Sequence, residues 1–160
     1  MGIFRELGIR GGKDRINEEV VYTIARSYVF LEQAISNFLS KYNLTPAKFN
    51  ILLMAKHRGN GKGLPQNEIS KLLLVTTSNI TRMVDKLEKD NYVERLAKKG
   101  DRRVNLIKIT GKGSVLLDEI WPHYETMLDN LIVSQFSDQD KRAMVNLLDR
   151  FKVEKVESES

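Results

Sequence analysis

The 160-residue chain contains no cysteine, which excludes disulfides, zinc sites built on thiolates and any redox switch that works through a thiol. It also lacks a run of about 20 apolar residues, the length that a membrane-spanning helix needs. The basic segment 1–15 has no long apolar stretch and so does not read as a secretion signal. These absences predict a cytoplasmic protein with no membrane partner.

Motifs for catalysis and metal binding are missing as well. The chain has no nucleophile elbow, no coupled His and carboxylate set, and no phosphate-binding loop, because the glycines between Gly59 and Gly63 are spaced too irregularly. His57 and His123 stand apart, without a second ligand at metal-binding spacing. We therefore expect no catalytic residue, no cofactor and no metal site, and do not expect an enzyme.

Positive charge is concentrated in the middle of the chain. Residues 61–112 hold twelve Lys or Arg against six Asp or Glu, whereas residues 113–160 hold five against ten. Clustered positive charge suits a module that binds a polyanion, because contacts to phosphates need it. On charge alone, an ordinary solvated surface explains the imbalance equally well.

Apolar residues at three- and four-residue steps predict the first helices. Residues 16–41 form one long helix with an apolar stripe. A second helix begins at Pro46 and ends before Gly59, and a third, short helix opens at Pro65 and includes Leu72.

A fourth helix is predicted from the polar run Thr76–Asn79, at least one of whose hydroxyls should cap it, to Asn91, which tolerates the left-handed conformation. Its buried stripe consists of Ile80, Met83, Val84 and Leu87. Its exposed and flanking residues are Thr77, Ser78, Asn79, Thr81, Arg82, Lys86 and Lys89. Short polar side chains near a helix N-terminus can bond phosphates or base edges, and Arg82 suits bidentate contact to guanine.

Two β-rich segments follow, Tyr92–Leu96 and Val104–Ile109, with a basic hairpin loop of seven residues, Ala97–Arg103, between them. The candidate core positions here are Val93, Leu106, Ile107 and Ile109. The cations of the loop are Lys98, Lys99, Arg102 and Arg103. They repel one another unless an anion is near, since only Asp101 compensates them. A solvated charged turn is the alternative.

Thr110 can cap a fifth helix whose apolar stripe begins at Val115, and Pro122 inside it predicts a kink or break. Ser137 and Asp140 have the spacing of a capping box for a last helix.

This order of elements predicts a mainly α fold with a small β-hairpin wing: a winged helix-turn-helix with dimerisation helices at both ends. We expect a flexible arm at 1–15, a dimerisation helix at 16–44, a DNA-binding lobe at 45–110, C-terminal dimerisation helices at 111–153 and a disordered tail at 154–160. Packing of the terminal helices within one chain is the alternative to dimerisation.

The sequence resembles the MarR family of prokaryotic regulators from about Leu44 to Ile120. The motifs that carry the resemblance are Asn91–Leu96 (NYVERL), Asp101–Arg103 (DRR), Ile107–Gly113 (IKITGKG), Ile69–Leu73 (ISKLL) and Ser78–Leu87 (SNITRMVDKL). The chain departs from the family at Leu74 and Asn91, where many relatives carry Gly, so the turns there can differ.

The resemblance implies that Arg103 reaches the DNA at the wing, in the minor groove, and that Asp101 holds it by an ion pair. It also implies dimers that bind small aromatic or phenolic anions in a cleft between the dimer platform and the DNA-binding lobe. The residues that could line such a pocket are Tyr28, Trp121, His123, Tyr124 and Met127. Core or dimer contacts are the more ordinary explanation for them. The lack of cysteine separates the chain from the peroxide-sensing subgroup of the family.

We therefore expect a sequence-specific regulator of transcription that binds double-stranded DNA, a repressor rather than an activator. A homodimer would place two recognition helices about 34 Å apart on a pseudo-palindromic operator. A small aromatic effector would release it. A protein-binding scaffold is the competing hypothesis, but its wing would not need four basic residues.

Overall fold

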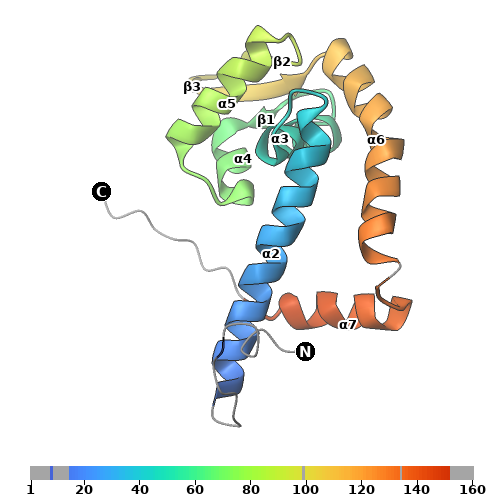
Figure 1. Cartoon of the computed structure of the whole chain (residues 1–160). Helices are drawn as coiled ribbons and strands as arrows, with labels where there is room; N and C mark the ends of the chain where they lie inside the picture. Colours follow the sequence, from blue (N-terminus) through green and yellow to red (C-terminus); the bar gives the residue numbers. More distant parts are fainter. Residues whose placement is uncertain (1–7, 9–14, 99, 134, 152–160) are drawn as a thin grey trace. The chain divides into compact units, whose positions relative to one another are not determined.

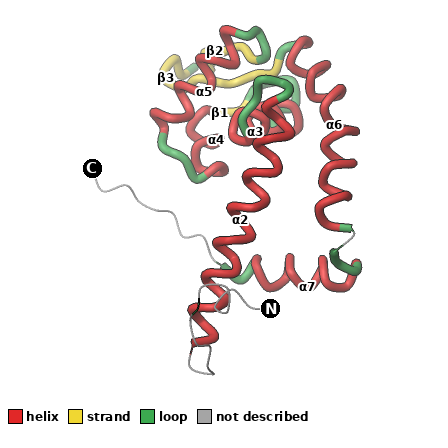
Figure 2. The backbone as a smooth tube through the Cα atoms, in the orientation of Figure 1, coloured by secondary structure: helices red, strands yellow, loops and turns green. Residues whose placement is uncertain are grey.

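The computed structural model describes residues 8, 15–98, 100–133 and 135–151, with only the backbone of residues 98 and 101–103 (Figure 1). Apart from Gly8 and Arg15, the predicted arm 1–15 lies outside the described residues, as does the predicted tail 154–160. The chain divides into two compact units, Met1–Pro46 and Ala47–Ser160. Helices dominate both, and the strands form one small sheet (Figure 2). The predicted fold class is confirmed.

The first unit contains one long helix, α2 (Ile16–Ser40), which ends within a residue of the predicted position. Asn43, at φ +56°, takes the left-handed conformation just beyond it. Leu39 is buried, but large apolar side chains along the helix are exposed. They are Ile16, Val20, Val21, Tyr22, Ile24, Tyr28, Val29 and Phe30. Within its own chain, α2 therefore leaves much apolar surface open to solvent.

The second unit begins with the predicted series of short helices: α3 (Pro46–His57), α4 (Gln66–Leu73) and α5 (Thr77–Lys89). The prediction that Pro65 opens a helix was wrong. Pro65 has an extended backbone (φ −57°, ψ 132°) and, with Leu64, forms strand β1 (Leu64–Pro65), so that α4 starts one residue later. Leu72 is 44% exposed and does not belong to the core.

The sheet has the order β1-β3-β2, with β2 (Val93–Lys98) and β3 (Asp101–Ile109) forming an antiparallel hairpin and β1 pairing with the other edge of β3. Figure 1 shows α4 and α5 beside this sheet. Side chains from α3, α4, α5, the sheet and α6 form the core. Its fully buried members are Phe49, Ile51, Leu52, Ile69, Ile80, Val84, Leu87, Ile107 and Ile120. Val93 is also buried, as predicted, whereas Leu106, Ile109 and Met83 are only half-buried.

Helix α6 (Gly111–Ile132) runs continuously through Pro122, so of the predicted kink or break the break does not occur. The predicted stripe is wrong at its first position, because Val115 is 67% exposed while Leu117 is buried. Gly113, Leu117 and Ile120 are the buried residues of α6, and a helix turns about 100° per residue, which places Val115 on the opposite side.

The junction between β3 and α6 is fastened to the turn after α5. The Thr110 hydroxyl caps α6 by accepting from the Gly113 amide (3.1 Å) and donates to the Asn91 carbonyl (2.7 Å). The Thr110 amide donates to the Tyr92 carbonyl (3.1 Å), and Lys112 bonds the Asp90 carbonyl (2.9 Å). The end of α5 is thereby held in place by the start of α6.

The last helix, α7 (Asp138–Leu148), begins with the predicted capping box: the Asp140 amide donates to the Ser137 hydroxyl and the Asp140 carboxylate accepts from the Ser137 amide (3.0 Å). Hydrogen bonds from the Ser137 hydroxyl and amide lower the pKa of Asp140. Val145, Leu147, Leu148 and, beyond the helix, Phe151 are exposed.

No helix in the described part of the chain is both long enough and apolar enough to cross a bilayer.

Candidate nucleic-acid interface

Helix α5 begins with a single hydroxyl cap. Thr76 is the N-cap, and its Oγ1 accepts from the Asn79 amide (3.4 Å) and lies 3.2 Å from the Ser78 Oγ. The prediction that at least one of Thr76, Thr77 and Ser78 caps the helix is confirmed. At the other end, Asn91 has φ +60°, the left-handed conformation predicted for the residue that stops the helix.

The polar residues predicted for the outer face of α5 are exposed. We call Ser78, Asn79, Arg82 and Lys86 the recognition stripe. Neither Arg82 nor Lys86 has an ion-pair partner among the described residues. The opposite face carries the buried Ile80, Val84 and Leu87. The stripe therefore presents hydroxyl, amide and cationic groups to solvent from a helix whose other side is fixed in the core.

Thr77 and Thr81 flank the stripe, and the Thr81 hydroxyl is already engaged within the protein. It donates to the Thr77 carbonyl (3.0 Å) and accepts from Gln66 Nε2 on α4 (2.9 Å). A hydroxyl has one proton to donate, so Thr81 has none left for an external acceptor in this arrangement. Its bonds tie α4 to α5.

The turn between α4 and α5 contains a leucine in the left-handed conformation. Leu74 takes the left-handed conformation (φ 53°, ψ 40°), and its amide and that of Val75 both donate to the Ser70 carbonyl. Leucine is disfavoured there because its Cβ crowds the backbone, whereas glycine has no Cβ. The turn therefore uses a conformation that suits glycine, and the leucine adds strain there.

We expect Leu74→Gly to stabilise the protein by about 0.5–1 kcal/mol, because relief of left-handed strain exceeds the entropy cost of glycine. Little packing is lost, since Leu74 is 66% exposed. The midpoint of urea unfolding measures the gain. Asn91→Gly is the matched control and should gain less, because asparagine tolerates φ +60°. An equal or larger gain in the control would contradict the strain at Leu74.

The hairpin tip is shorter than predicted. Strand β2 extends to Lys98 and β3 starts at Asp101, so the seven-residue loop was wrong and only Lys99 and Gly100 separate the strands. Gly100, at φ +88°, allows the tight turn, and the register shifts between Ala97 and Lys98. The two strands remain paired within the basic segment, whose charged composition had indicated a loop.

The predicted wing contacts stay predictions. Lys99 lies outside the described residues, as do the side chains of Lys98, Asp101, Arg102 and Arg103. This includes the ion pair expected between Asp101 and Arg103.

Arg95 on β2 was not singled out from the sequence, yet it makes the most extensive polar contacts near α5. Its guanidinium forms ion pairs with Asp85 (2.5 Å) and Glu88 and donates to the Thr81 carbonyl (3.3 Å), while its amide donates to Glu88 Oε1 (3.2 Å). The only sequence signal was an arginine in the NYVERL motif.

Four residues of the predicted effector pocket, Trp121, His123, Tyr124 and Met127, lie on α6, and the structure brings two of them into contact. Tyr124 packs on Phe49 of α3 and on Trp121, with ring centroids 5.0 and 6.0 Å apart. Burial raises the pKa of the Tyr124 hydroxyl. Met127 is half-buried.

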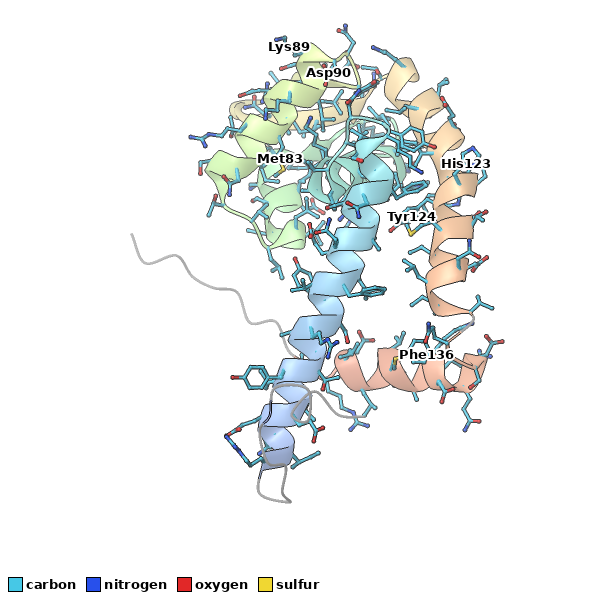
Figure 3. The ribbon with its side chains drawn as sticks, in the orientation of Figure 1. Met83, Lys89, Asp90, His123, Tyr124 and Phe136 are labelled. Carbon is cyan, nitrogen blue, oxygen red and sulfur yellow. The ribbon has the colours of Figure 1, made fainter. Side chains whose placement is uncertain are left out.

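The other two predicted pocket residues are placed differently. His123 is exposed and points away from Tyr124 on α6 (Figure 3). Tyr28 belongs to the first unit, where it is 67% exposed. Among the described residues, no three His, Cys, Asp or Glu side chains gather closely enough to hold a metal ion.

Comparison with known proteins identifies relatives of this chain. The MarR family model matches residues 44–104. The HTH-type transcriptional regulator PecS of Dickeya dadantii is 31% identical over 132 residues, which cover 82% of this chain and 78% of PecS. The HTH-type transcriptional regulator MhqR of Bacillus subtilis is 31% identical over 127 residues, covering 79% and 85%.

A solved structure has the same fold. It is that of Sco3205 from Streptomyces coelicolor, a MarR family transcriptional regulator in complex with DNA, which matches with a TM-score of 0.78 at 16% identity and covers 87% of this chain and 86% of that one. The resemblance that the motifs indicated is confirmed by relatives of 31% identity that match over most of their length. The chain belongs to the MarR family.

Proposed function

We propose that this protein is a cytoplasmic regulator that binds double-stranded DNA in a sequence-specific manner and represses transcription. Its relatives PecS and MhqR are named transcriptional regulators, and membership of their family makes this chain a regulator rather than an enzyme. The observation that carries the proposal is the recognition stripe of α5, where Arg82 and Lys86 are exposed and have no ion-pair partner among the described residues.

The proposed contact places α5 in the major groove. The groove is wide enough to admit a helix, and its base pairs display distinct donor and acceptor patterns. Ser78 and Asn79 lie near the helix N-terminus, where backbone amides favour phosphate, and Thr77 flanks them. Arg82 reads guanine, and Lys86 lies one turn further along, suited to the phosphate backbone.

The hairpin of β2 and β3 is the proposed second contact. Lys98, Lys99, Arg102 and Arg103 supply its positive charge, and Asp101 orients Arg103 toward the minor groove. The proposal is supported by the excess of positive charge in residues 61–112 and by the DNA complex of Sco3205. In this assignment, residues 45–110 form the DNA-binding lobe.

We propose further that residues 16–44 and 111–153 form a homodimer platform. The exposed apolar side chains of α2 and, separately, of α7 support it, because monomeric soluble proteins rarely leave large apolar patches in water. A twofold dimer binds a pseudo-palindromic operator with half-sites about 34 Å apart.

Dimerisation predicts that light scattering at micromolar concentration gives about twice the 18.4 kDa mass of the chain. Replacing two exposed apolar residues of α2, Val21→Glu and Val29→Glu, should lower that mass. A mass of one chain for the wild type would contradict the dimer.

The proposed effector is a small aromatic or phenolic anion that releases the operator. Trp121, Tyr124 and Met127 supply aromatic and apolar surface on α6, and His123 and Tyr28 complete the proposed set. A screen of such anions for loss of DNA affinity tests this part on its own.

Selection of bound fragments from the native genome tests the central proposal. The wild type should enrich duplexes that share a pseudo-palindrome, and their affinity should fall steeply as salt rises, because bound phosphates release counterions. The positions of these duplexes relative to promoters should be those at which a bound protein blocks transcription. Absence of salt-dependent binding to any duplex would refute the proposal.

A further inference from the structure

Arg95 connects the two elements that are proposed to touch DNA. It lies on strand β2 of the hairpin and forms two ion pairs with carboxylates of helix α5. A third bond from its guanidinium reaches the Thr81 carbonyl of the same helix (3.3 Å). We call the bonds from Arg95 to Thr81, Asp85 and Glu88 the Arg95 clamp.

The acceptors of the clamp lie along one side of α5. Thr81, Asp85 and Glu88 have the four- and three-residue spacing that places residues on one helix face. They come directly after the buried residues Ile80, Val84 and Leu87, respectively. This side of the helix therefore lies next to its buried face. The planar guanidinium can engage several acceptors at fixed angles, which the ammonium of lysine cannot.

The clamp restricts motion between hairpin and helix more than a single ion pair would. The Arg95 side chain is only 22% exposed, and its backbone amide also bonds Glu88, which fixes the strand itself. The guanidinium therefore bridges two turns of α5 from one position on β2. Tilt of the helix against the hairpin would break several of these bonds together.

The clamp also controls charge beside the recognition stripe. Asp85 is 57% exposed and lies one turn from Arg82 on α5. A free carboxylate there would repel the phosphates that Arg82 and Lys86 attract. Arg95 offsets this negative charge from the side of the hairpin.

We propose that Arg95 is a positioning residue of the DNA-binding site: it holds hairpin and recognition helix at the spacing and charge that a specific duplex requires. The inference rests on the proposed function, and it concerns selectivity rather than folding. Arg95 acts through α5 and β2, and the proposal assigns it no contact with DNA.

A second ion pair of the same hairpin provides a control. Lys108 of β3 pairs with Glu94 of β2 (2.9 Å), across the strands. Within the described residues, neither Lys108 nor Glu94 forms a hydrogen bond or ion pair with α5. Lys108→Gln removes the same charge as Arg95→Gln from the same hairpin but leaves the clamp intact.

The experiment compares Arg95→Gln, Arg95→Lys and Lys108→Gln with the wild type, each as the full chain at a temperature where circular dichroism shows it folded. Affinity is measured at several salt concentrations for a duplex selected by the wild type and for a random duplex of equal length. We expect Arg95→Gln to lose about tenfold in the ratio of the two affinities. Arg95→Lys should also lose selectivity, with an unchanged salt dependence, because it keeps the charge but not the planar fork.

Lys108→Gln should weaken binding to both duplexes by a similar small factor and keep the ratio. A purely structural Arg95 would lower thermal stability while the folded variants kept the wild-type ratio, and that result would overturn the inference. An equal loss of ratio in Lys108→Gln would overturn it too. A wild type without selectivity would refute the proposed function and this inference with it, whereas a selective wild type with equally selective Arg95 variants refutes the inference alone.

Discussion

Gly113→Ala is expected to lower the free energy of unfolding by about 3 kcal/mol, the upper part of the range for overpacked sites. A Cβ at Gly113 would lie 2.2 Å from the Tyr92 carbonyl oxygen and 3.0 Å from Ile109 Cγ1. The first neighbour is backbone and cannot rotate away. Relief requires α6 to move from the turn after α5, which breaks the Thr110 bonds to Asn91 and Tyr92.

The same helix offers a control of opposite sign. Gly111 opens α6, and a Cβ there meets nothing within 4 Å. Gly111→Ala should be neutral or stabilise by up to about 1 kcal/mol, because alanine restricts the unfolded chain more than glycine does. Urea unfolding of both variants measures the contrast. Equal stability of the two would contradict a close approach of backbone at Gly113.

Because the junction fastens the end of α5, a folded Gly113→Ala protein should also bind DNA less well. Thr110 and Lys112 donate to the Asn91 and Asp90 carbonyls of this turn, and the Gly113 amide donates to the Thr110 hydroxyl. The second glycine of the TGKG segment, Gly113, is therefore required by the lack of space for a Cβ and not by its backbone angles. Only its missing Cβ allows α6 to lie against Tyr92.

Features set by local chemistry were predictable from the sequence. Thr110 and the Ser137–Asp140 pair lie at helix starts because their oxygens satisfy free amides within three residues. Asn91 ends α5 for the same kind of local reason, its tolerance of positive φ. The exposed and buried faces of α5 also followed, because a strongly amphipathic helix has one orientation that buries Ile80, Val84 and Leu87.

Features set by partners distant in sequence were not predictable. Strand β1 has two residues, one of them proline, and exists only because Leu64 and Pro65 pair with Ile107 and Leu106. The hairpin extends into the basic segment because each added pair hydrogen-bonds to the opposite strand, which composition does not report. Val115 faces solvent because α6 packs on the core through Leu117 instead. The apolar residues of that helix allowed more than one choice of buried face.

The residues of the candidate site also fall into those that local sequence predicts and those that depend on distant partners. Exposure of Arg82 and Lys86 followed from periodicity alone. The internal bonds of Thr81 and the Arg95 clamp depend on Gln66 and on β2, which pattern does not bring together. The sequence therefore identified groups that face outward and missed groups that hold them in position.

Arg82→Ala is expected to weaken binding to a selected duplex by about 1–3 kcal/mol and to relax the preference at one base pair, because arginine bonds guanine through two acceptors at once. The fold should be unaffected, since Arg82 is exposed and has no partner among the described residues. Affinities for the duplex and for its single base-pair variants measure both effects.

Lys89 provides the matched control on the same helix. It lies at the C-terminal end of α5, beside Asp90 and three turns from the N-terminal residues that are proposed to enter the groove (Figure 3). Lys89→Ala removes one positive charge, as Arg82→Ala does, and should weaken all duplexes alike, with a salt slope lower by about one if it faces a phosphate. Only the loss at Arg82 should depend on the base sequence. If both variants lowered affinity uniformly, α5 would contribute charge without reading bases, and sequence selection would have to come from the hairpin or from the shape of the DNA.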